Sequence, residues 1–540
     1  MNLSKEFFSS VVRTWIAFLA AGTFFAMMVP MGEGFDEPWH FSYIQQIAQQ
    51  RRLPRGHSSK ISKEVDFFIH THPIAWGLHE SHPNLISYDE YWSARISEES
   101  ERLLQSLRFA GAFVDSDTEL STQYEGHQPP LYYFISAPVF ALSARLFSFM
   151  NTFLVLRLFS VFLSSFVVAP ALFLAYTILK DNTAASKVGA LLVLFPGIYP
   201  GVARVSNDAL VVPLACGALL FLVLFLQKQE GTFGVRHIKP IKQVPDPFWG
   251  LCAFVVAGLW TKAFFISIVV GILLVMALYR RFKPAAILML VSVLGWPWYV
   301  YNFFQTGSFT GLPETIATNA SVLASTRLFS VLDWKNVFSV VTGSHIWIGN
   351  WSFISVRSWM YRVVLWLFVL GILGLLRHGR RSLRPVLPLI VVYITFGAGL
   401  AYYAIQVFQA TGVSVAQGWY LSSFVPVEAL LFVAGCRSWF SQRWLPPVIF
   451  GQIVLTLLLV YSAAFVEMPY YAGMTAHKPD GHLAAYVPHL GDFGIISARP
   501  LRFYPHVPTF FPWILLLGVI GFALDSVARR NGDPSRKPRP

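Results

Sequence analysis

Repeated apolar runs of about 20 residues are the feature that most constrains this chain. Crossing about 30 Å of hydrocarbon as a helix takes roughly 20 residues, and inside lipid only helices or closed barrels satisfy every backbone hydrogen bond. The 540-residue chain is 55% hydrophobic and only 13% charged, whereas soluble domains carry about 25% charged residues. The sequence therefore predicts an all-α polytopic membrane protein.

We expect about 12 transmembrane helices. Residues 1–30 hold the first, and the later ones are predicted at 152–179, 186–203, 208–227, 249–263, 264–279, 284–303, 358–376, 386–408, 418–436, 445–466 and 510–528. Two segments remain open. Residues 131–150 form either a span or a helix along the membrane interface, and residues 249–279 form either one long helix or two short ones.

The distribution of basic residues favours one answer for both segments. Cytoplasmic loops carry an excess of Lys and Arg. If 131–150 is interfacial and 249–279 is a hairpin, the basic clusters all fall on one side. These clusters are Lys180/Lys187, Lys228/Arg236/Lys239/Lys242, Arg280/Arg281/Lys283, Arg377/Arg380/Arg381/Arg384, Arg437/Arg443 and Arg529/Arg530. We therefore expect both chain ends in the cytoplasm, with a disordered tail at 529–540.

The same topology divides the chain into alternating blocks. We expect an external first loop at 31–150, spans 2–7 at 151–303, an external loop at 304–357, spans 8–11 at 358–466, an external loop at 467–509 and the last span at 510–528. Residues 31–130 hold 15 of the 28 acidic residues but only 8 of the 41 basic ones, so their net charge is −7, against +20 for the rest. This asymmetry fits a bilayer and argues against nucleic acid as a partner.

Two amphipathic helices are predicted in the first loop. In GFDEPWHFSYIQQIAQQRRLP (34–54), we expect Glu37 to cap a helix whose first position is Pro38, a place that favours proline. A second helix is predicted from the capping-box pair Ser87 and Glu90. Its apolar face comprises Trp92, Ile96, Leu103 and Leu107, with Gly111 beyond its end. Both helices fit a position along the bilayer surface.

The first of these helices begins with two acids and a histidine. Asp36 and Glu37 lie at the helix N-terminus, where the helix dipole favours ionised carboxylates, and His40 follows on the same side. An ionised acid there suits a general base or a metal ligand. Capping explains one carboxylate but not two acids and a histidine at the membrane edge. We predict that all three are functional, with a divalent cation at Asp36 and Glu37 as an open alternative.

A second polar stretch, YEGHQPPLYY (124–133), returns the chain to the membrane. Glu125, His127 and Gln128 offer an acid, a proton carrier and an amide, and the two prolines that follow fix an extended backbone. As an alternative, Tyr132 and Tyr133 are aromatic residues of an interface belt. The density of polar groups favours a functional site.

Cationic residues are predicted at the external ends of several spans. Arg204, Asn207 and Asp208 lie between two spans, Lys262 lies at the hairpin turn, and Arg357 precedes a span. Ionisable groups near membrane depth are candidates for function, and a phosphate would be drawn to the cations. The alternative is that Arg204 pairs with Asp208 while Lys262 extends toward the interface. Both interpretations remain open.

Four histidines in the first loop raise the question of zinc. They are His70, His72, His79 and His82. No cysteine or firm ligand spacing accompanies them, so no metal site is predicted there.

Taken together and in order, these stretches resemble a known family. FDEPWHFSYIQQIAQQRRLP resembles the acidic first-loop motif of the GT-C superfamily of membrane glycosyltransferases, and the likeness is closest to the protein O-mannosyltransferases and aminoarabinose transferases (glycosyltransferase family 39-like). EGHQPPLYY is similar to the second first-loop motif, while VSNDAL, WTKAFF, GWPWYVYNFF and AQGWYLSSFVPV look like later landmarks. The resemblance covers most of the chain to about residue 430.

The resemblance implies transfer of a sugar from a polyprenyl-phosphate carrier to an external protein, lipid or glycan, with inversion. Asp36 would be the base, supported by Glu37 and His40, and Arg204, Lys262 and Arg357 would face the donor phosphate. Residues implied around the sugar and acceptor are Glu125, His127, Gln128, Tyr132, Asn207, Asp208, Trp419 and Tyr420. The sequence departs from the family at GWY (418–420), where a Gly-Arg-Tyr-like motif is expected. The implied location is a bacterial or archaeal cell membrane.

Two other classes of protein remain as alternatives. One is a transporter or flippase of a lipid-linked glycan, and the other is a noncatalytic assembly subunit with the same fold. Transporters often show internal repeats and polar residues at the membrane midplane. In this sequence no repeat is visible and the polar groups gather at the external ends, which favours the enzyme.

Overall fold

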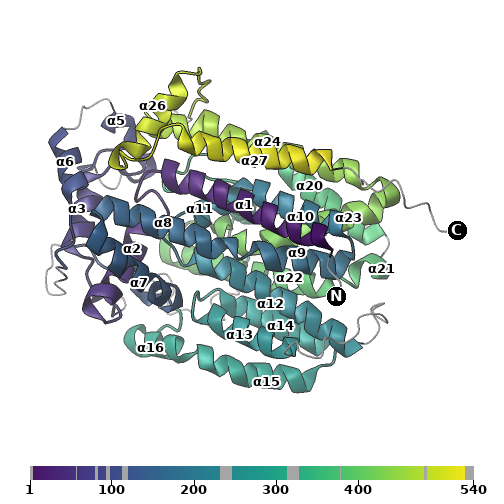
Figure 1. The fold of residues 1–540 in the computed structure, drawn as a ribbon. Coiled ribbons are helices and arrows are strands. Elements are labelled where there is room, and N and C mark those ends of the chain that lie inside the picture. Colours follow the sequence, from purple (N-terminus) through teal and green to yellow (C-terminus); the bar gives the residue numbers. More distant parts are fainter. Residues whose placement is uncertain are drawn as a thin grey trace.

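The computed structural model describes residues 4–529 apart from 56–57, 80–82, 93–97, 112, 114–119, 231–245, 313–327, 378 and 479–482. Throughout this part of the chain the secondary structure is helical, and the β-type pairs it contains are isolated bridges. The predicted all-α class is confirmed. Figure 1 shows long helices running side by side, with shorter helices gathered at one end.

Eight helices of the described chain are long and apolar enough to cross a membrane. They are α1 (Lys5–Met28), α8 with α9 (Phe149–Leu179), α12 (Asp208–Glu230), α20 (Ser358–Arg377), α22 (Leu387–Thr411), the turn η5 with α23 (Gly418–Arg443), α24 with the turns after it (Leu445–Tyr471) and α27 (Phe511–Ala528). Each coincides with a predicted span. A multi-pass membrane protein is therefore the class that the fold supports.

Two further apolar segments are each a pair of helices with a sharp bend between them, which is either a broken span or a re-entrant loop. Asn182–Leu194 (α10) bends by 59° into Pro196–Val202, which includes α11 (Tyr199–Val202), and Phe282–Gly295, which includes α15 (Phe282–Ser292), bends by 54° into α16 (Pro297–Thr306). A proline stands at each break, where it removes a backbone donor and clashes with the preceding turn. Counting each bent pair as one span gives 10 spans within the described residues. The predicted count of 12 is not confirmed.

The segment 249–279 forms two short helices. They are α13 (Pro247–Leu259) and α14 (Phe265–Leu278). The start of α13 lies beside the end of α12, because Asp246 pairs with Lys228 at 3.0 Å, and Lys262 beyond its end pairs with Asp208 at the start of α12. The chain turns between the two helices, as the hairpin alternative requires.

The other uncertain segment is also a short helix. Helix α7 (Leu131–Leu146) has 16 residues and packs against α2 (Glu37–Gln50) and α8 (Phe149–Ser165). In Figure 1 it is seen nearly end-on, whereas α8 and α12 run across the view. This orientation fits a helix lying across the ends of the spans, and its position at a membrane interface stays a prediction.

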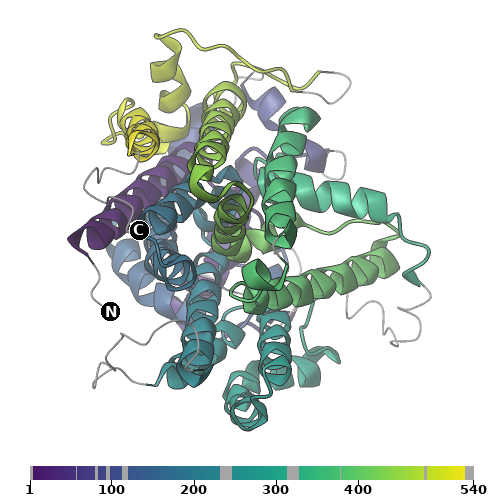
Figure 2. The same ribbon diagram turned by 90° about the vertical axis from the view of Figure 1, so that its right-hand side faces the viewer.

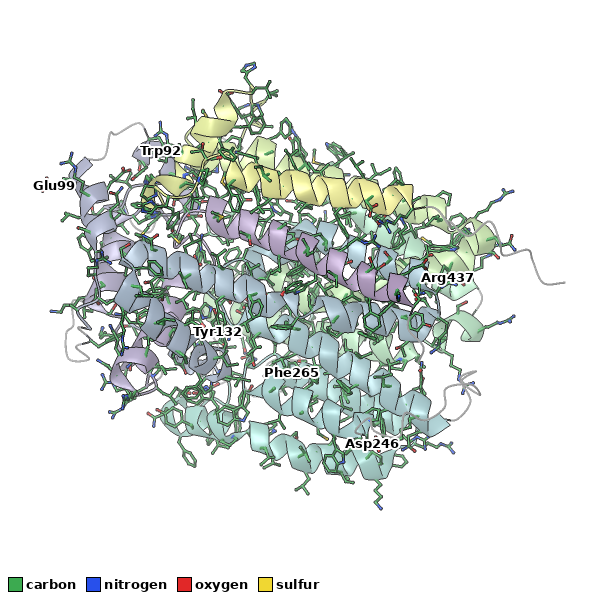
Figure 3. All side chains as sticks on the ribbon, viewed as in Figure 1. Trp92, Glu99, Tyr132, Asp246, Phe265 and Arg437 are labelled. Carbon is green, nitrogen blue, oxygen red and sulfur yellow. The ribbon has the colours of Figure 1, made fainter. Side chains whose placement is uncertain are left out.

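The first-loop helices lie at one end of the helical body, and the start of α1 and the end of α27 lie at the other. Helix α1 begins and α27 ends on the same side (Figure 1), and Figure 2 faces that side. Figure 3 places Asp246 and Arg437 there, and Trp92 and Glu99 at the opposite end. We call the end with the first-loop helices the outer end, in keeping with the predicted topology. The start of α1 and the end of α27 therefore lie at the other end of the bundle.

The first-loop helices begin differently from the prediction. Asp36, not Glu37, is the residue before α2; its backbone is left-handed (φ 57°) and its side chain makes no capping hydrogen bond. The predicted cap at Glu37 is wrong, because Glu37 is the first helical residue. The Ser87–Glu90 capping box is confirmed, but its helix, α5, covers only Tyr88–Tyr91, and Glu98–Ser106 (α6) is separate. Ile96 lies outside the described residues.

Candidate functional site

The deepest charge pair of the outer end joins α2 to α8. Arg157 and Glu37 are both fully buried, and Arg157 donates Nε to Oε1 at 2.7 Å and Nη2 to Oε2 at 2.5 Å. Arg157 also donates to the backbone oxygens of Ala26, Val29 and Pro30. A bidentate pair with every donor used is a strong, geometrically specific contact.

Glu37 also accepts three backbone N–H groups. These come from Gly32 at 3.2 Å, Gly34 at 3.3 Å and Val205 at 2.8 Å. The carboxylate is thus fully engaged with Arg157 and with the turn before α12. This arrangement holds the start of the first loop against the spans. It also leaves Glu37 no free oxygen for a substrate. We call Glu37, Arg157 and these three N–H groups the Glu37 clamp.

Asp36 faces the opposite way. It is only partly buried and lines a cavity of about 500 Å³ together with Glu33, Trp39, Tyr124 and Trp351. The left-handed backbone at Asp36 is a conformation that Asp and Asn tolerate better than most residues, and it separates the direction of this side chain from that of Glu37. We call this space the outer cavity.

Glu125, His40 and Tyr133 form a buried polar group behind Asp36. His40 Nδ1 lies 2.8 Å from the Tyr133 hydroxyl and 3.9 Å from Glu125 Oε2. Burial, and then the charge of Asp36, raises the pKa of Glu125 to about 8. Burial, followed by the charges of Arg204 and Lys262, holds the pKa of His40 well below its usual value. Around neutral pH, Glu125 is therefore a protonated acid and His40 a neutral imidazole.

A second charged group, the Asp208 triad, is built from the turn that leads into α12 and the turn between α13 and α14. Asp208, at the start of α12, accepts from Arg204 Nη2 at 2.7 Å and from Lys262 Nζ. Arg204 also donates to the backbone oxygen of Phe35, next to Asp36. The predicted alternative that Arg204 pairs with Asp208 is confirmed. Lys262 does not extend toward the interface, because it is buried and shares the same carboxylate.

Aromatic rings and amides connect the triad to the first loop. Trp419 stacks on Phe35 with ring centroids 4.0 Å apart, and Lys262 Nζ lies 5.5 Å from the centroid of the Tyr420 ring. Asn207 donates to Gln128 Oε1 at 3.0 Å, tying the stretch 124–128 to the same place. The acidic motif, the second polar stretch and the cations therefore meet, although more than 220 residues separate Asp36 from Lys262 in the sequence.

Three predicted residues take other positions. Arg357 is exposed just before α20, whereas the triad is buried. The Tyr132 hydroxyl is bonded to Ser160 Oγ at 2.7 Å, so this ring fastens α7 to α8. His127 bonds through Nδ1 to the Tyr124 oxygen, and its own backbone oxygen accepts from Trp298 and Asn302. The structure does not bring Arg357 into the site, and it gives Tyr132 a packing role.

Of the four loop histidines, the structure describes the side chains of two, His70 and His72. His70 and His72 line the outer cavity, while His82 and the side chain of His79 lie outside the described residues. Burial lowers the pKa of His72 to about 3. Within the described chain, no three His, Cys, Asp or Glu residues are grouped so as to hold a metal ion.

Sequence reasoning missed Arg157, Glu33 and Tyr133 as site residues. Glu33 is buried beside the outer cavity, where its Oε2 accepts from Ser352 Oγ at 2.7 Å and from the Tyr471 hydroxyl at 2.9 Å, and burial raises its pKa to about 7. Arg157 did leave a signal, since an arginine inside an apolar span is expected to have a buried partner. Tyr133 was considered only as a belt residue.

A scan against protein-family models gives no match for this chain, and neither does a search of curated proteins. Function is therefore inferred from the geometry of the site and from the family resemblance of its motifs.

Proposed function

We propose that the protein is an integral-membrane glycosyltransferase that moves a sugar from a polyprenyl-phosphate donor to an acceptor at the outer end. One observation carries this proposal. A carboxylate on the wall of a cavity, Asp36, lies beside a buried pair of cations, Arg204 and Lys262, and Arg204 bonds the backbone next to it. A base next to cations that can hold a phosphate is the arrangement that glycosyl transfer from a lipid phosphate requires.

In the proposed reaction, Asp36 takes the proton from an acceptor hydroxyl or amine in the outer cavity. The acceptor atom attacks the anomeric carbon from the side opposite the phosphate, the carbon–oxygen bond to the phosphate breaks, and the configuration inverts. Glu37 cannot replace Asp36, since its oxygens are held by Arg157 and three N–H groups. The Glu37 clamp instead fixes the base in position.

The Asp208 triad would stabilise the leaving phosphate. Two cations share one carboxylate, so the triad keeps a charge of +1. Buried positive charge is worth more there than in water, because the surrounding dielectric constant is low. Asp208 thus acts as a positioning residue that holds both cations in place, rather than as a contact to the sugar.

Two apolar cavities beside the α13–α14 hairpin fit the lipid part of such a donor. One of about 320 Å³ is lined by Leu259 and Ile266, on either side of the turn that carries Lys262, and one of about 520 Å³ is lined by Trp260. An isoprenoid chain whose phosphate lies at Lys262 would find apolar surface beside both helices of this hairpin.

The test is turnover by the purified protein in lipid, with radiolabelled polyprenyl-phosphate sugars and protein, lipid and glycan acceptors. We expect Asp36→Asn to lower the rate by roughly 10²- to 10⁴-fold, the range that a general base contributes. Asp246→Asn is the matched control, because Asp246 lies at the other end of α12 in a partly exposed pair with Lys228.

Unchanged turnover in Asp36→Asn would remove the base assignment. No turnover with any donor, together with movement of the lipid from one leaflet to the other, would favour a transporter. The anomeric configuration of the product, read by NMR, checks inversion.

A further inference from the structure

The predicted external loop 467–509 contains a segment that stands out from the rest of the molecule. Residues 483–498 follow α25 (Met468–Tyr471) in the chain and end with α26 (Asp492–Ala498). Figure 1 shows α26 standing out beyond α27, and in Figure 2 the same segment lies at the rim of the molecule. We call residues 483–498 the side arm.

The side arm exposes large apolar side chains. Leu490 keeps 93% of its surface exposed and Val487 keeps 72%, and Ile495 on α26 is exposed as well. Single exposed leucines are common, but a group of them on one projecting segment marks an interaction surface.

Very little charge accompanies this apolar surface. Residues 483–498 contain no Lys or Arg, and their one acidic residue is Asp492. The Asp492 carboxylate accepts from the Tyr486 hydroxyl and from the backbone N–H of His489, each at 2.8 Å. The carboxylate is therefore bonded within the arm, and the arm offers no cation to a charged partner.

Two hydrogen bonds fix the height of the side arm relative to the spans. The Tyr486 N–H donates to the backbone oxygen of Phe465 at 2.8 Å, near the outer end of the candidate span Leu445–Tyr471. Trp513 Nε1, in the first turn of α27, donates to the Phe493 oxygen at 3.0 Å, and the two rings meet edge to face with centroids 4.7 Å apart. Both attachments therefore lie at the ends of spans, which is the height where Tyr and Trp concentrate at a membrane–water interface.

The exposed side chains of the arm adjoin those of α27. Phe510, Ile514 and Leu517 are exposed around the start of this helix, and 28% of the α27 span is buried inside the molecule. Lipid tails are as apolar as leucine, so an exposed apolar face on a membrane span contacts lipid. The side arm extends this lipid-facing surface sideways from the bundle.

We propose that the side arm is an interfacial anchor that lies in the outer leaflet of the bilayer, with Val487 and Leu490 among the upper parts of the acyl chains. Its partner is the apolar part of the lipid and not an anionic headgroup, because attraction to anionic lipid requires Lys or Arg near the surface. The loop that the sequence places outside thus returns to the membrane before α27 begins. This proposal does not depend on glycosyl transfer.

The test measures the depth of position 490 in the whole protein, reconstituted in phosphatidylcholine nanodiscs. Leu490→Cys is labelled with the fluorophore NBD, and wild-type protein carried through the same labelling gives the background, since its three cysteines are buried. Doxyl groups on the lipid, near the top or near the end of the acyl chain, quench by contact, and iodide quenches from water. We expect the upper doxyl group to quench more than the lower one, with loss of iodide quenching and a blue-shifted emission.

Two matched positions calibrate the measurement. Glu99→Cys is exposed on α6 at the outer end (Figure 3), and we expect iodide quenching without doxyl quenching there. Leu517→Cys lies in the second turn of α27, and we expect the lower doxyl group to be its stronger quencher. Adding phosphatidylglycerol to the lipid should leave the values at position 490 unchanged, because the arm carries no cation.

Three results would overturn the proposal. Iodide quenching at position 490 as strong as at position 99, without doxyl quenching, would place the arm in water. A blue-shifted emission without doxyl quenching, lost when each nanodisc holds one copy, would assign the surface to a second copy of the chain. Insertion only in lipid that contains phosphatidylglycerol would make charge its cause. None of these results bears on the role of Asp36, which is measured separately by turnover.

Discussion

The Glu37 clamp and the outer cavity begin at neighbouring residues but treat their carboxylates in opposite ways. In the clamp, Glu37 is fully buried and surrounded by donors from Arg157 and three backbone N–H groups. At the outer cavity, Asp36 is partly exposed on the wall of a space of about 500 Å³. The comparison teaches that two adjacent acids are told apart by where the fold places their side chains, one enclosed with an arginine and one on a cavity wall, and not by their charge or position in a motif.

Arg157→Met should break the clamp and have the largest effect on stability. Removing one partner of a buried ion pair leaves the other charge uncompensated, at a cost of about 3–5 kcal/mol. We expect a large fall in thermal stability, or loss of folded protein, by fluorescence-detected size exclusion after heating. Arg145→Met is the matched control, because Arg145 is exposed on α7. Equal melting of the two variants would contradict the clamp.

The next largest expected effect is the pH dependence of stability that Glu125 causes. The pKa of Glu125 is raised to about 8 from an ordinary value of 4.5, so the unfolded chain loses this proton near pH 4.5 while the folded protein keeps it to about pH 8. Stability is fully present below pH 4.5 and falls as the pH rises to 8. At roughly 1.4 kcal/mol per pKa unit, the loss from pH 5 to pH 8 is about 3–4 kcal/mol.

Glu125→Gln should flatten this dependence of the melting temperature on pH. Glu33, whose pKa is raised to about 7, contributes a smaller loss in the same direction, so Glu33→Gln should flatten it less. A wild-type melting temperature that rises from pH 5 to pH 8, with both variants parallel to it, would show that neither acid is buried in its protonated form.

Asp208→Asn tests whether Asp208 has a structural role, as Glu37 has in the clamp, or contacts the ligand directly, as proposed for Asp36. The variant leaves two buried cations without their shared charge, and we expect a loss of about 2 kcal/mol, smaller than for Arg157→Met because an amide oxygen still accepts one bond. Donor affinity should also fall as the cations lose their positions. A change in donor affinity with no change in melting temperature would indicate that Asp208 contacts the ligand directly.

Asp36→Asn should have the smallest effect on stability, within about 0.5 kcal/mol, as for surface changes away from packed features. Asn adopts the left-handed backbone as readily as Asp, and the Asp36 side chain does not cap α2. The contrast with the large loss of activity expected for the same variant is what separates a chemical role from a structural one. A melting temperature as low as that of Arg157→Met would place Asp36 inside the clamp.

The sequence predicted the spans well because apolar length is a local property. Each long helix falls on a predicted segment, and the break between α13 and α14 follows from the hairpin alternative. The cap of α2 was predicted wrongly, since both Asp36 and Glu37 suit a helix start and only the backbone angle at Asp36 decides between them.

The candidate site was predicted in part, including the Arg204–Asp208 pair but neither Arg157 nor the other pairings. Asp208, Arg204 and Lys262 were expected near one another, and the structure joins them. The partner of Glu37 could not be predicted, because Arg157 is 120 residues away and its pairing depends on how α8 packs against the loop. Arg357 was predicted to face the donor phosphate only because it is a cation. The charge of a residue does not determine whether the folded chain buries it.

In the predicted topology, the Glu37–Arg157 pair also constrains the order in which segments of the chain cross or enter the membrane. An arginine inside an inserting helix is costly unless it finds a partner, and Arg157 lies in the first third of the span that α8 and α9 form together. Its carboxylate partner belongs to a segment that is synthesised earlier and, in the predicted topology, crosses the membrane before α8 inserts. In that topology, a chain whose first loop failed to cross would present α8 to the insertion machinery with an unmatched charge.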